Sequence, residues 1–222
     1  MKKLIALVLL AMLAVTADAG RKKEKSGVVT EHTFTDSKYG FQMTADDNWG
    51  IKTSGPEASV RVIFVQKKFE VPPDYLATPD YTKVPRIVTY IDTTTLGAYA
   101  FVDSLISPTY KSKQKSEILK EFELLAEREL NARARQPFTL GNDKGVRWDG
   151  RAPYLKEVEL GGSRTGGKRV RSAYLGSILA IKRGNLIVVF HIMTEEMFFQ
   201  TVMTEALKIV GSIKWPEEAP AK

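Results

Sequence analysis

The chain has 222 residues, a formal net charge of +7 and no cysteine. The absence of cysteine excludes disulfides, thiolate nucleophiles, zinc sites built on cysteine and a lipid-modified cysteine near the N-terminus. The hydrophobic fraction of 43% and the charged fraction of 27% are typical of a globular protein, so we expect packing alone to stabilise one sizeable domain.

The N-terminal segment has the three parts of a secretory signal peptide. Two lysines precede an apolar run from Leu4 to Val15, and Ala17-Asp-Ala19 supplies small residues at a cleavage site. The apolar run is shorter than the roughly twenty residues of a membrane-spanning helix. We therefore expect residues 1–19 to be removed on export, which leaves a periplasmic or secreted chain with no transmembrane span.

Tails flank the expected domain. Residues 20–32 include Arg21-Lys-Lys-Glu-Lys25, so a flexible basic tail is predicted there, which could also associate with anionic lipid or polymer. Residues 216–222 are short and polar and indicate a loose C-terminal end. A single globular domain is therefore predicted over residues 33–215.

Several runs of β-branched and aromatic residues predict strands that are apolar on both faces, which indicates cover on both faces. These runs are Val62–Val65, Ile87–Ile91, Val170–Arg183 and Leu186–Met193. Gly184-Asn185 joins the last two, and a two-residue loop with glycine first is typical of a type II′ hairpin. This turn predicts that Arg183 lies opposite Leu186 and that Ile178 lies opposite His191.

Three segments predict helices. The clearest begins after Thr194, its expected N-cap, and ends near Gly211. Its apolar residues recur with a period of about 3.6, at Phe199, Val202, Met203, Ala206 and Val210.

A shorter helix is predicted over Leu96–Ile106, with Leu96, Tyr99, Val102 and either Leu105 or Ile106 on its apolar side. A charged helix is predicted over about residues 113–135. Together, the strands and helices predict an α+β fold. We expect an α/β/α sandwich in which helices cover both faces of a central antiparallel-rich sheet.

Four segments resemble the PsbP-like superfamily over roughly residues 33–215. They are Tyr39-Gly-Phe-Gln-Met43 with Asn48-Trp49, Gly145-Val-Arg-Trp148, Gly184-Asn-Leu-Ile-Val-Val-Phe190, and Ser212-Ile-Lys-Trp215. That family includes the extrinsic PsbP subunit of photosystem II, a nuclear Ran-binding protein and many exported bacterial proteins. The resemblance implies an α/β/α sandwich around an antiparallel sheet and a binding or assembly role, without shared catalytic residues.

Candidate catalytic and metal-binding residues have simpler structural explanations. The segment from Gly162 to Lys168 has the glycine spacing of a phosphate-binding loop, but Arg169 replaces the magnesium-binding hydroxyl and a strand pattern follows. His32 and His191 lack a paired ligand spacing, and His191 is expected to be a neutral core imidazole. Asp46-Asp47 is expected to form a turn. We therefore predict no catalytic residue, cofactor or metal.

The densest basic and aromatic stretch surrounds the same glycine-rich loop, and a positive end to that hairpin would attract an anionic partner. The candidate binding residues are Arg147, Arg151, Arg164, Lys168, Arg169 and Arg171. A solvated rim without a partner is the alternative interpretation. Because export separates the chain from nucleic acid, we expect an unknown protein or an anionic envelope surface.

The function predicted from the sequence is that of an exported, soluble, non-enzymatic domain that binds such a partner. Two alternatives remain open. An exported hydrolase would require a deep pocket with convergent titratable groups. A small-ligand carrier would require a closed apolar pocket between the sheet and a helix.

Overall fold

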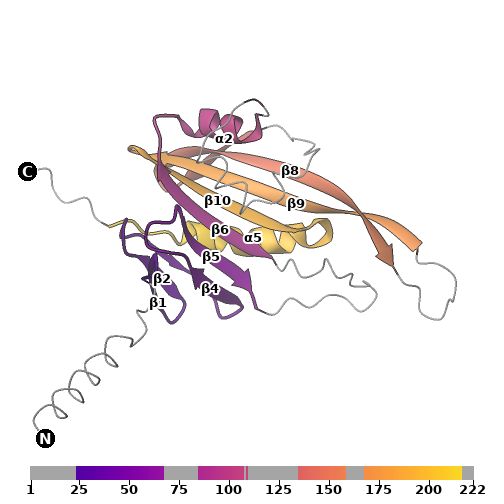
Figure 1. Ribbon diagram of the computed structural model, residues 1–222, viewed down its shortest axis with the longest axis horizontal. Coiled ribbons are helices and arrows are strands. Elements are labelled where there is room, and N and C mark those ends of the chain that lie inside the picture. Colours follow the sequence, from indigo (N-terminus) through magenta and orange to yellow (C-terminus); the bar gives the residue numbers. More distant parts are fainter. Residues whose placement is uncertain (1–23, 68–84, 108, 110–134, 159–167, 217–222) are drawn as a thin grey trace, which may run out of the picture.

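The computed structural model describes residues 24–67, 85–107, 109, 135–158 and 168–216. A seven-stranded antiparallel sheet forms the main layer, and a three-stranded antiparallel sheet packs beside one end of it (Figure 1). The large sheet has the order β4 (Trp49–Thr53), β5 (Val60–Gln66), β6 (Arg86–Thr93), β10 (Leu186–Glu195), β9 (Lys168–Arg183), β8 (Asp143–Val158) and β7 (Gln136–Leu140). The small sheet contains β1 (Gly27–Thr30), β2 (Thr33–Asp36) and β3 (Gln42–Thr44).

Two α-helices and one short 3-10 helix complete the described part of the chain. They are α2 (Ala98–Ile106), η2 (Glu196–Phe198) and α5 (Phe199–Gly211). The predicted α+β class and the antiparallel sheet are therefore confirmed.

The β9–β10 hairpin has the predicted turn and register. Gly184 has a positive φ of 56°, whereas Asn185 is not among the positive-φ residues, and this combination defines a type II′ turn. Arg183 lies opposite Leu186, and Ile178 lies opposite His191. A two-residue turn sets the register of the whole β9–β10 strand pair. The local sequence of the turn was therefore sufficient to predict this register.

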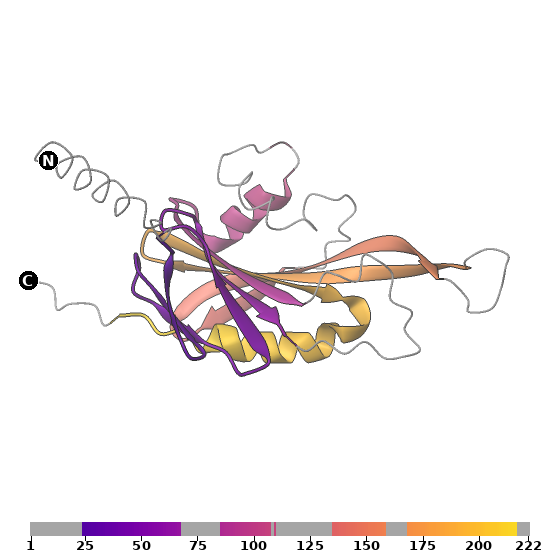
Figure 2. The ribbon, with the colours of Figure 1, turned by 60° about the horizontal axis from the view of Figure 1, so that its bottom comes forward.

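The core consists of two buried clusters, and α2 and α5 lie on opposite sides of the large sheet (Figure 2). One cluster joins α5 to sheet residues such as Phe190 and to the small sheet. The other joins α2 to residues such as Trp148. Helical cover of both whole faces stays a prediction, because α2 has nine residues and residues 113–134 of the third expected helix lie outside the described residues.

The start of α5 differs from the prediction. Thr194 is not an N-cap: it lies in β10 opposite Leu175, because the β9–β10 ladder continues to Glu195. The helix begins at Phe199 and ends at Gly211, as expected at that end. All five predicted apolar positions of this helix are buried.

The apolar face of α2 agrees with the prediction at Val102 and Leu105 but not at Tyr99. Tyr99 is 45% exposed, whereas Phe101 is 2% exposed and belongs to the core. The buried residues Ala98, Phe101, Val102 and Leu105 follow the i, i+3, i+4, i+7 pattern of one helix face. Both Tyr99 and Phe101 lie within the predicted helix, and the packing of α2 against β8 and β9 buries Phe101 and leaves Tyr99 exposed.

The small sheet includes part of the segment expected to be a tail. Ser26 is buried, and its backbone N–H donates to the Ser54 carbonyl at 2.8 Å immediately before β1 begins. The run Val28-Val-Thr30 is β-branched and favours a strand. The predicted domain boundary at residue 33 is therefore too late in the chain. The other edge of the small sheet is closed by reciprocal backbone hydrogen bonds between Gln42 and Lys214.

The turn between β1 and β2 contains a strained residue. Glu31 has a φ of 53°, in the left-handed region where long L side chains are disfavoured. We expect Glu31→Asn to raise the free energy of unfolding by roughly 0.5–1 kcal/mol, because asparagine tolerates this conformation. Urea unfolding measures the change, and Glu57→Asn, at an exposed position without a positive φ, serves as the control. An unchanged midpoint for Glu31→Asn would contradict this assignment of strain.

Candidate functional site

The β8–β9 hairpin extends beyond the rest of the large sheet. The two strands pair from Gly145 opposite Ile181 to Val158 opposite Lys168. On the β9 side, pairing with β10 ends at Tyr174. In the described part of the chain, residues 153–158 and 168–173 therefore have no strand partner except each other. We call these two segments the arm, which projects to the right in Figures 1 and 2.

The arm contains three of the six predicted binding residues. In the backbone register of β9, Lys168, Arg169 and Arg171 lie opposite Val158, Glu157 and Leu155. Four basic residues and one acidic residue lie in the described arm, which gives it a formal charge of +3: Lys156, Lys168, Arg169 and Arg171 against Glu157. Arg164 lies outside the described residues. The structure therefore places the backbone of three predicted binding residues in a hairpin that projects beyond the rest of the large sheet.

Arg147 and Arg151 lie nearer the sheet, and each is paired with a carboxylate. The Arg147 Nε donates to both carboxylate oxygens of Asp149, at 2.9 and 3.1 Å. Arg151 donates from Nε and Nη2 to Glu196, at 2.9 and 2.8 Å, and this hydrogen bonding raises the pKa of Arg151. The paired carboxylates offset the charge of these two arginines.

The sequence contained a signal for one of these pairs. Arg147 and Asp149 are two residues apart in one strand, so they share a face of the sheet. Arg151 and Glu196 are 45 positions apart, and only the packing of η2 beside β9 brings them together.

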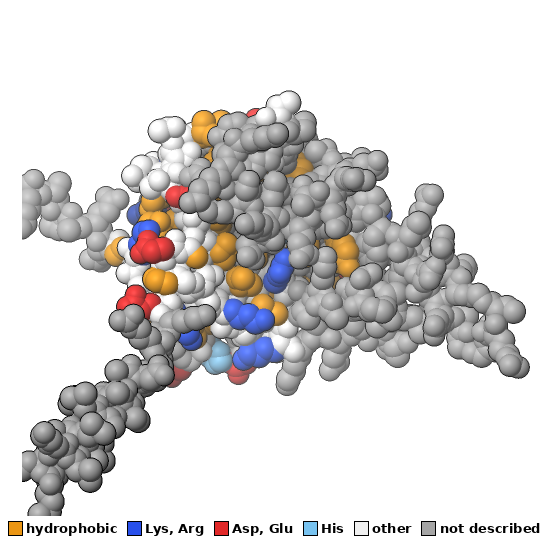
Figure 3. Space-filling model, in the orientation of Figure 1, with side chains coloured by type: hydrophobic (Ala, Val, Ile, Leu, Met, Phe, Trp, Pro, Cys, Tyr) orange, Lys and Arg blue, Asp and Glu red, His pale blue; other side chains and the backbone are white. Residues whose placement is uncertain are grey.

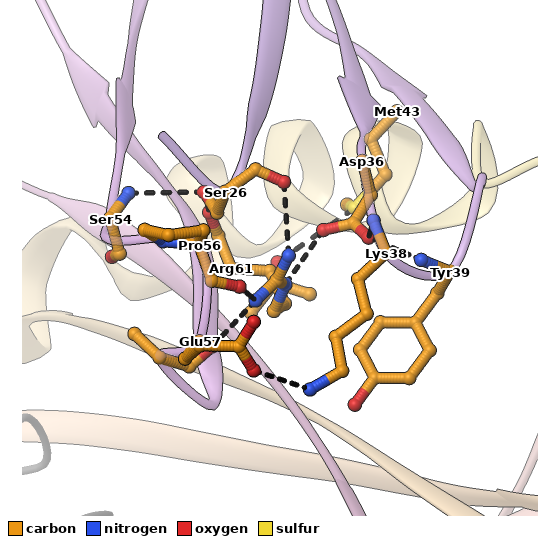
Figure 4. Close-up of polar contacts among 11 residues, drawn as sticks. Ser26, Asp36, Lys38, Tyr39, Met43, Ser54, Pro56, Glu57 and Arg61 are labelled. Carbon is orange, nitrogen blue, oxygen red and sulfur yellow. Dashed lines mark hydrogen bonds and ion pairs between the residues drawn. The ribbon is translucent and has the colours of Figure 1, made fainter. Parts of the chain in front are cut away.

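A buried polar cluster that was not predicted from the sequence lies between the two sheets (Figure 4). Arg61 is 1% exposed, and its Nε donates to Asp36 Oδ2 at 2.7 Å. Its guanidinium also donates to the carbonyl oxygens of Ser26, Pro56 and Ala58, at 3.0, 2.7 and 2.8 Å. The charge is thus both paired and hydrogen-bonded, as a buried charge must be.

Asp36 and a β-bulge complete this cluster. Asp36 Oδ1 accepts the backbone N–H groups of Lys38 and Tyr39, at 2.8 and 2.6 Å. In β5 the register shifts between Val60 and Val62, so Arg61 is the extra residue of a bulge. Since its polar groups are occupied by structural partners, the cluster joins β1, β2 and β5 and is not a candidate catalytic site. In the sequence, a single arginine within an otherwise apolar strand was the signal that could have indicated a buried charge.

The histidines and Ser177 do not form a catalytic arrangement. His191 is 1% exposed, and burial, with a smaller effect of the Arg86 charge, lowers its pKa from 6.5 to about 3. The imidazole is therefore neutral at physiological pH, as predicted. The Ser177 hydroxyl donates to Asp149 at 2.6 Å. Ser177 and His191 lie on opposite faces of the sheet, because their direct cross-strand partners are Ile192 and Ile178, which belong to different core clusters.

His32 and the two aspartates lie at the surface. His32 Nε2 and Asp47 Oδ1 are 2.8 Å apart. The Asp46 side chain accepts the backbone N–H of Asn48 at 2.9 Å, which confirms the predicted turn role of that residue. No group of three or more potential metal ligands lies together among the residues that the structure describes.

A groove of about 1090 Å³ lies between β1 and β4. Its lining includes Val28 and Val29 from β1, Ile51 and Lys52 from β4, and Glu24. The described side chains that line it include one carboxylate and two ammonium groups, from Glu24, Lys25 and Lys52, but no pair of carboxylates. It lies between two strands, whereas the small-ligand carrier would need a pocket between the sheet and a helix. On the face shown in Figure 3, the described basic, acidic and hydrophobic side chains are interspersed.

Within the described ranges, no helix combines the length and the apolar character needed to cross a membrane. No family model matches the sequence, and no curated protein matches it.

Several solved structures are similar to this chain. LpqN of Mycobacterium tuberculosis, described as involved in cell envelope biogenesis, is 14% identical over 79% of this chain and 83% of its own, with a TM-score of 0.43. The PsbP protein of the cyanobacterium Synechocystis is 13% identical over 83% and 91%, with a TM-score of 0.38. The Ran-binding protein Mog1p of Saccharomyces cerevisiae is 10% identical over 79% and 89%, with a TM-score of 0.42.

A cyanobacterial PsbP is thus among the matched structures. The likeness is distant in both sequence and backbone. The architecture described above follows from the strand order and register of this chain itself.

Proposed function

We propose that this chain is an exported, non-enzymatic binding domain whose arm contacts an anionic partner, either a protein or an envelope surface. The observation that carries the proposal is the position of Lys168, Arg169 and Arg171 in a hairpin that extends past β10. A positive element held away from the body of a protein meets a negative surface first and strengthens long-range attraction.

The location and domain organisation belong to the same proposal. The signal-peptide pattern of residues 1–19 supports export to the periplasm or the exterior. The globular domain then extends to residue 215 and includes β1. Its helices would form the outer layers of an α/β/α sandwich, as their positions on opposite sides of the sheet in Figure 2 support.

Charge reversal in the arm tests the proposed contact. We expect Arg169→Glu combined with Arg171→Glu to weaken capture by immobilised polyglutamate, or by vesicles containing phosphatidylglycerol, by about tenfold or more, because each basic residue near an anionic surface contributes roughly 1 kcal/mol. Co-sedimentation at low salt measures vesicle binding, and added salt should weaken it.

The matched control reverses two exposed lysines in the body of the protein, Lys52→Glu and Lys208→Glu. It changes the net charge by the same amount and should retain most of the binding. Equal losses in both variants would show that net charge alone governs capture. Binding to neither probe by the wild-type chain would also overturn the proposal.

A further inference from the structure

The two-residue hairpins determine which backbone groups of β8 and β9 face outward. The two residues that flank such a turn form two backbone hydrogen bonds with each other. Along each strand, the backbone N–H and C=O groups of successive residues then point alternately toward one neighbouring strand and toward the other. Arg183 and Leu186 flank one turn, so odd-numbered residues of β9 face β10 and even-numbered residues face β8. Leu140 and Asp143 flank the other turn, so odd-numbered residues of β8 face β7. The two assignments agree, since Ile178 and Trp148, both even, lie opposite each other.

In the described part of the chain, no strand pairs with the outer edge of β9 beyond the end of β10. After the pair Tyr174–Glu195 the chain leaves the sheet and enters η2. By the alternation above, the backbone N–H and C=O groups of Arg169 and Arg171 point toward the row that β10 no longer occupies. No strand in the described part of the chain pairs with them there. An unpaired edge of this kind can accept an added strand.

The outer edge of β8 is less suited to the same role. Pairing with β7 stops at Arg147. Beyond it, the residues of β8 whose backbone groups face outward are Asp149, Arg151, Pro153, Leu155 and Glu157. Proline has no backbone N–H, so Pro153 interrupts the row of donors in the middle of this edge. The two edges of the arm therefore differ, and β9 is the one with an uninterrupted row.

We propose that the outer edge of β9 binds an extended segment of a partner protein that carries acidic residues at alternate positions. This inference rests on the proposed function and names its partner. Arg169 and Arg171 are two positions apart, so they share one face of the strand, where directly opposite acidic residues are favourable. The backbone groups supply affinity, and the alternate charges supply specificity.

The same features disfavour other occupants. A second copy of this edge would place arginine opposite arginine, and like charges directly opposite are destabilising. Lipid head groups would match the charge, but they have no row of amide donors and acceptors. An acidic strand is the occupant that satisfies both the backbone and the charge.

The test uses the purified full chain and a short fluorescent peptide that alternates glutamate and valine, with binding measured by fluorescence anisotropy. Two further peptides are N-methylated, one at every glutamate and one at every valine. In an added strand, alternate residues direct their N–H groups toward β9, so one N-methylated peptide should lose about tenfold or more in affinity while the other retains most of it. Arg169→Glu combined with Arg171→Glu should weaken binding of the unmethylated peptide. Circular dichroism confirms that this variant is folded.

Each outcome separates the two proposals. Equal affinities of the two N-methylated peptides would overturn strand addition and leave a purely electrostatic contact. Binding to phosphatidylglycerol vesicles without binding to the peptide would overturn strand addition while the proposed function stands. Binding to neither probe would overturn both.

Discussion

Replacing Arg61 with methionine is expected to lower the free energy of unfolding by about 3–5 kcal/mol, because it leaves a buried carboxylate without its charge partner. Arg61 and Asp36 are 1% and 2% exposed, so water cannot replace the lost interaction. The substitution also removes the donors to three backbone carbonyls that hold β1 and the loop after β4 in place. Urea unfolding measured by tryptophan fluorescence gives the change.

Two comparisons separate this effect from a general loss of packing. Lys38 and Glu57 form an ion pair of 3.1 Å at the surface, and Lys38→Met should cause little measurable change. Combining Arg61→Met with Asp36→Leu should recover part of the lost stability, because no charge is then left buried. A double variant as unstable as the sum of the two single variants would show that the ion pair is not the source of the effect.

Replacing His191 with leucine is expected to remove part of the acid sensitivity of the fold. The pKa of His191 is about 3 in the folded protein, against 6.5 for an ordinary histidine, mainly because the imidazole is buried. Between these two values the unfolded chain binds one more proton than the folded chain at this residue. The stability of the wild type therefore falls as the pH is lowered from about 6.5 toward about 3, by an amount on the order of a few kcal/mol.

The measurement is the urea midpoint of the wild type and of His191→Leu at several pH values in this window. The wild type should lose more stability than the variant as the pH falls, whereas the two should run parallel above pH 6.5. Val189→Ala, an uncharged change two positions away on the same face of β10, should lower stability by the same amount at every pH. Profiles of the wild type and His191→Leu that run parallel throughout would contradict a buried neutral histidine.

For the proposed binding residues, the sequence shows a basic stretch but not how the structure divides it. The basic stretch around the glycine-rich loop was visible in the sequence, but six residues were grouped there. The structure separates Arg147 and Arg151, whose carboxylate partners lie near the base of the hairpin, from Lys168, Arg169 and Arg171 in the arm. That separation depends on the residue at which β10 ends and η2 begins. The residue pattern of β9 gives no information about that position.

The sequence by itself determined the features that depend on neighbours close in the chain. These are the apolar runs of the strands, the apolar stripe of α5, and the Gly184-Asn185 turn that sets the β9–β10 register. The tertiary structure alone decided that Thr194 belongs to a strand, that Arg61 reaches Asp36, and that the β8–β9 hairpin extends past its neighbours. Each of these depends on which strands lie side by side and how far their pairing continues. Such contacts join segments that are distant in the sequence, so the residues of one segment alone do not predict them.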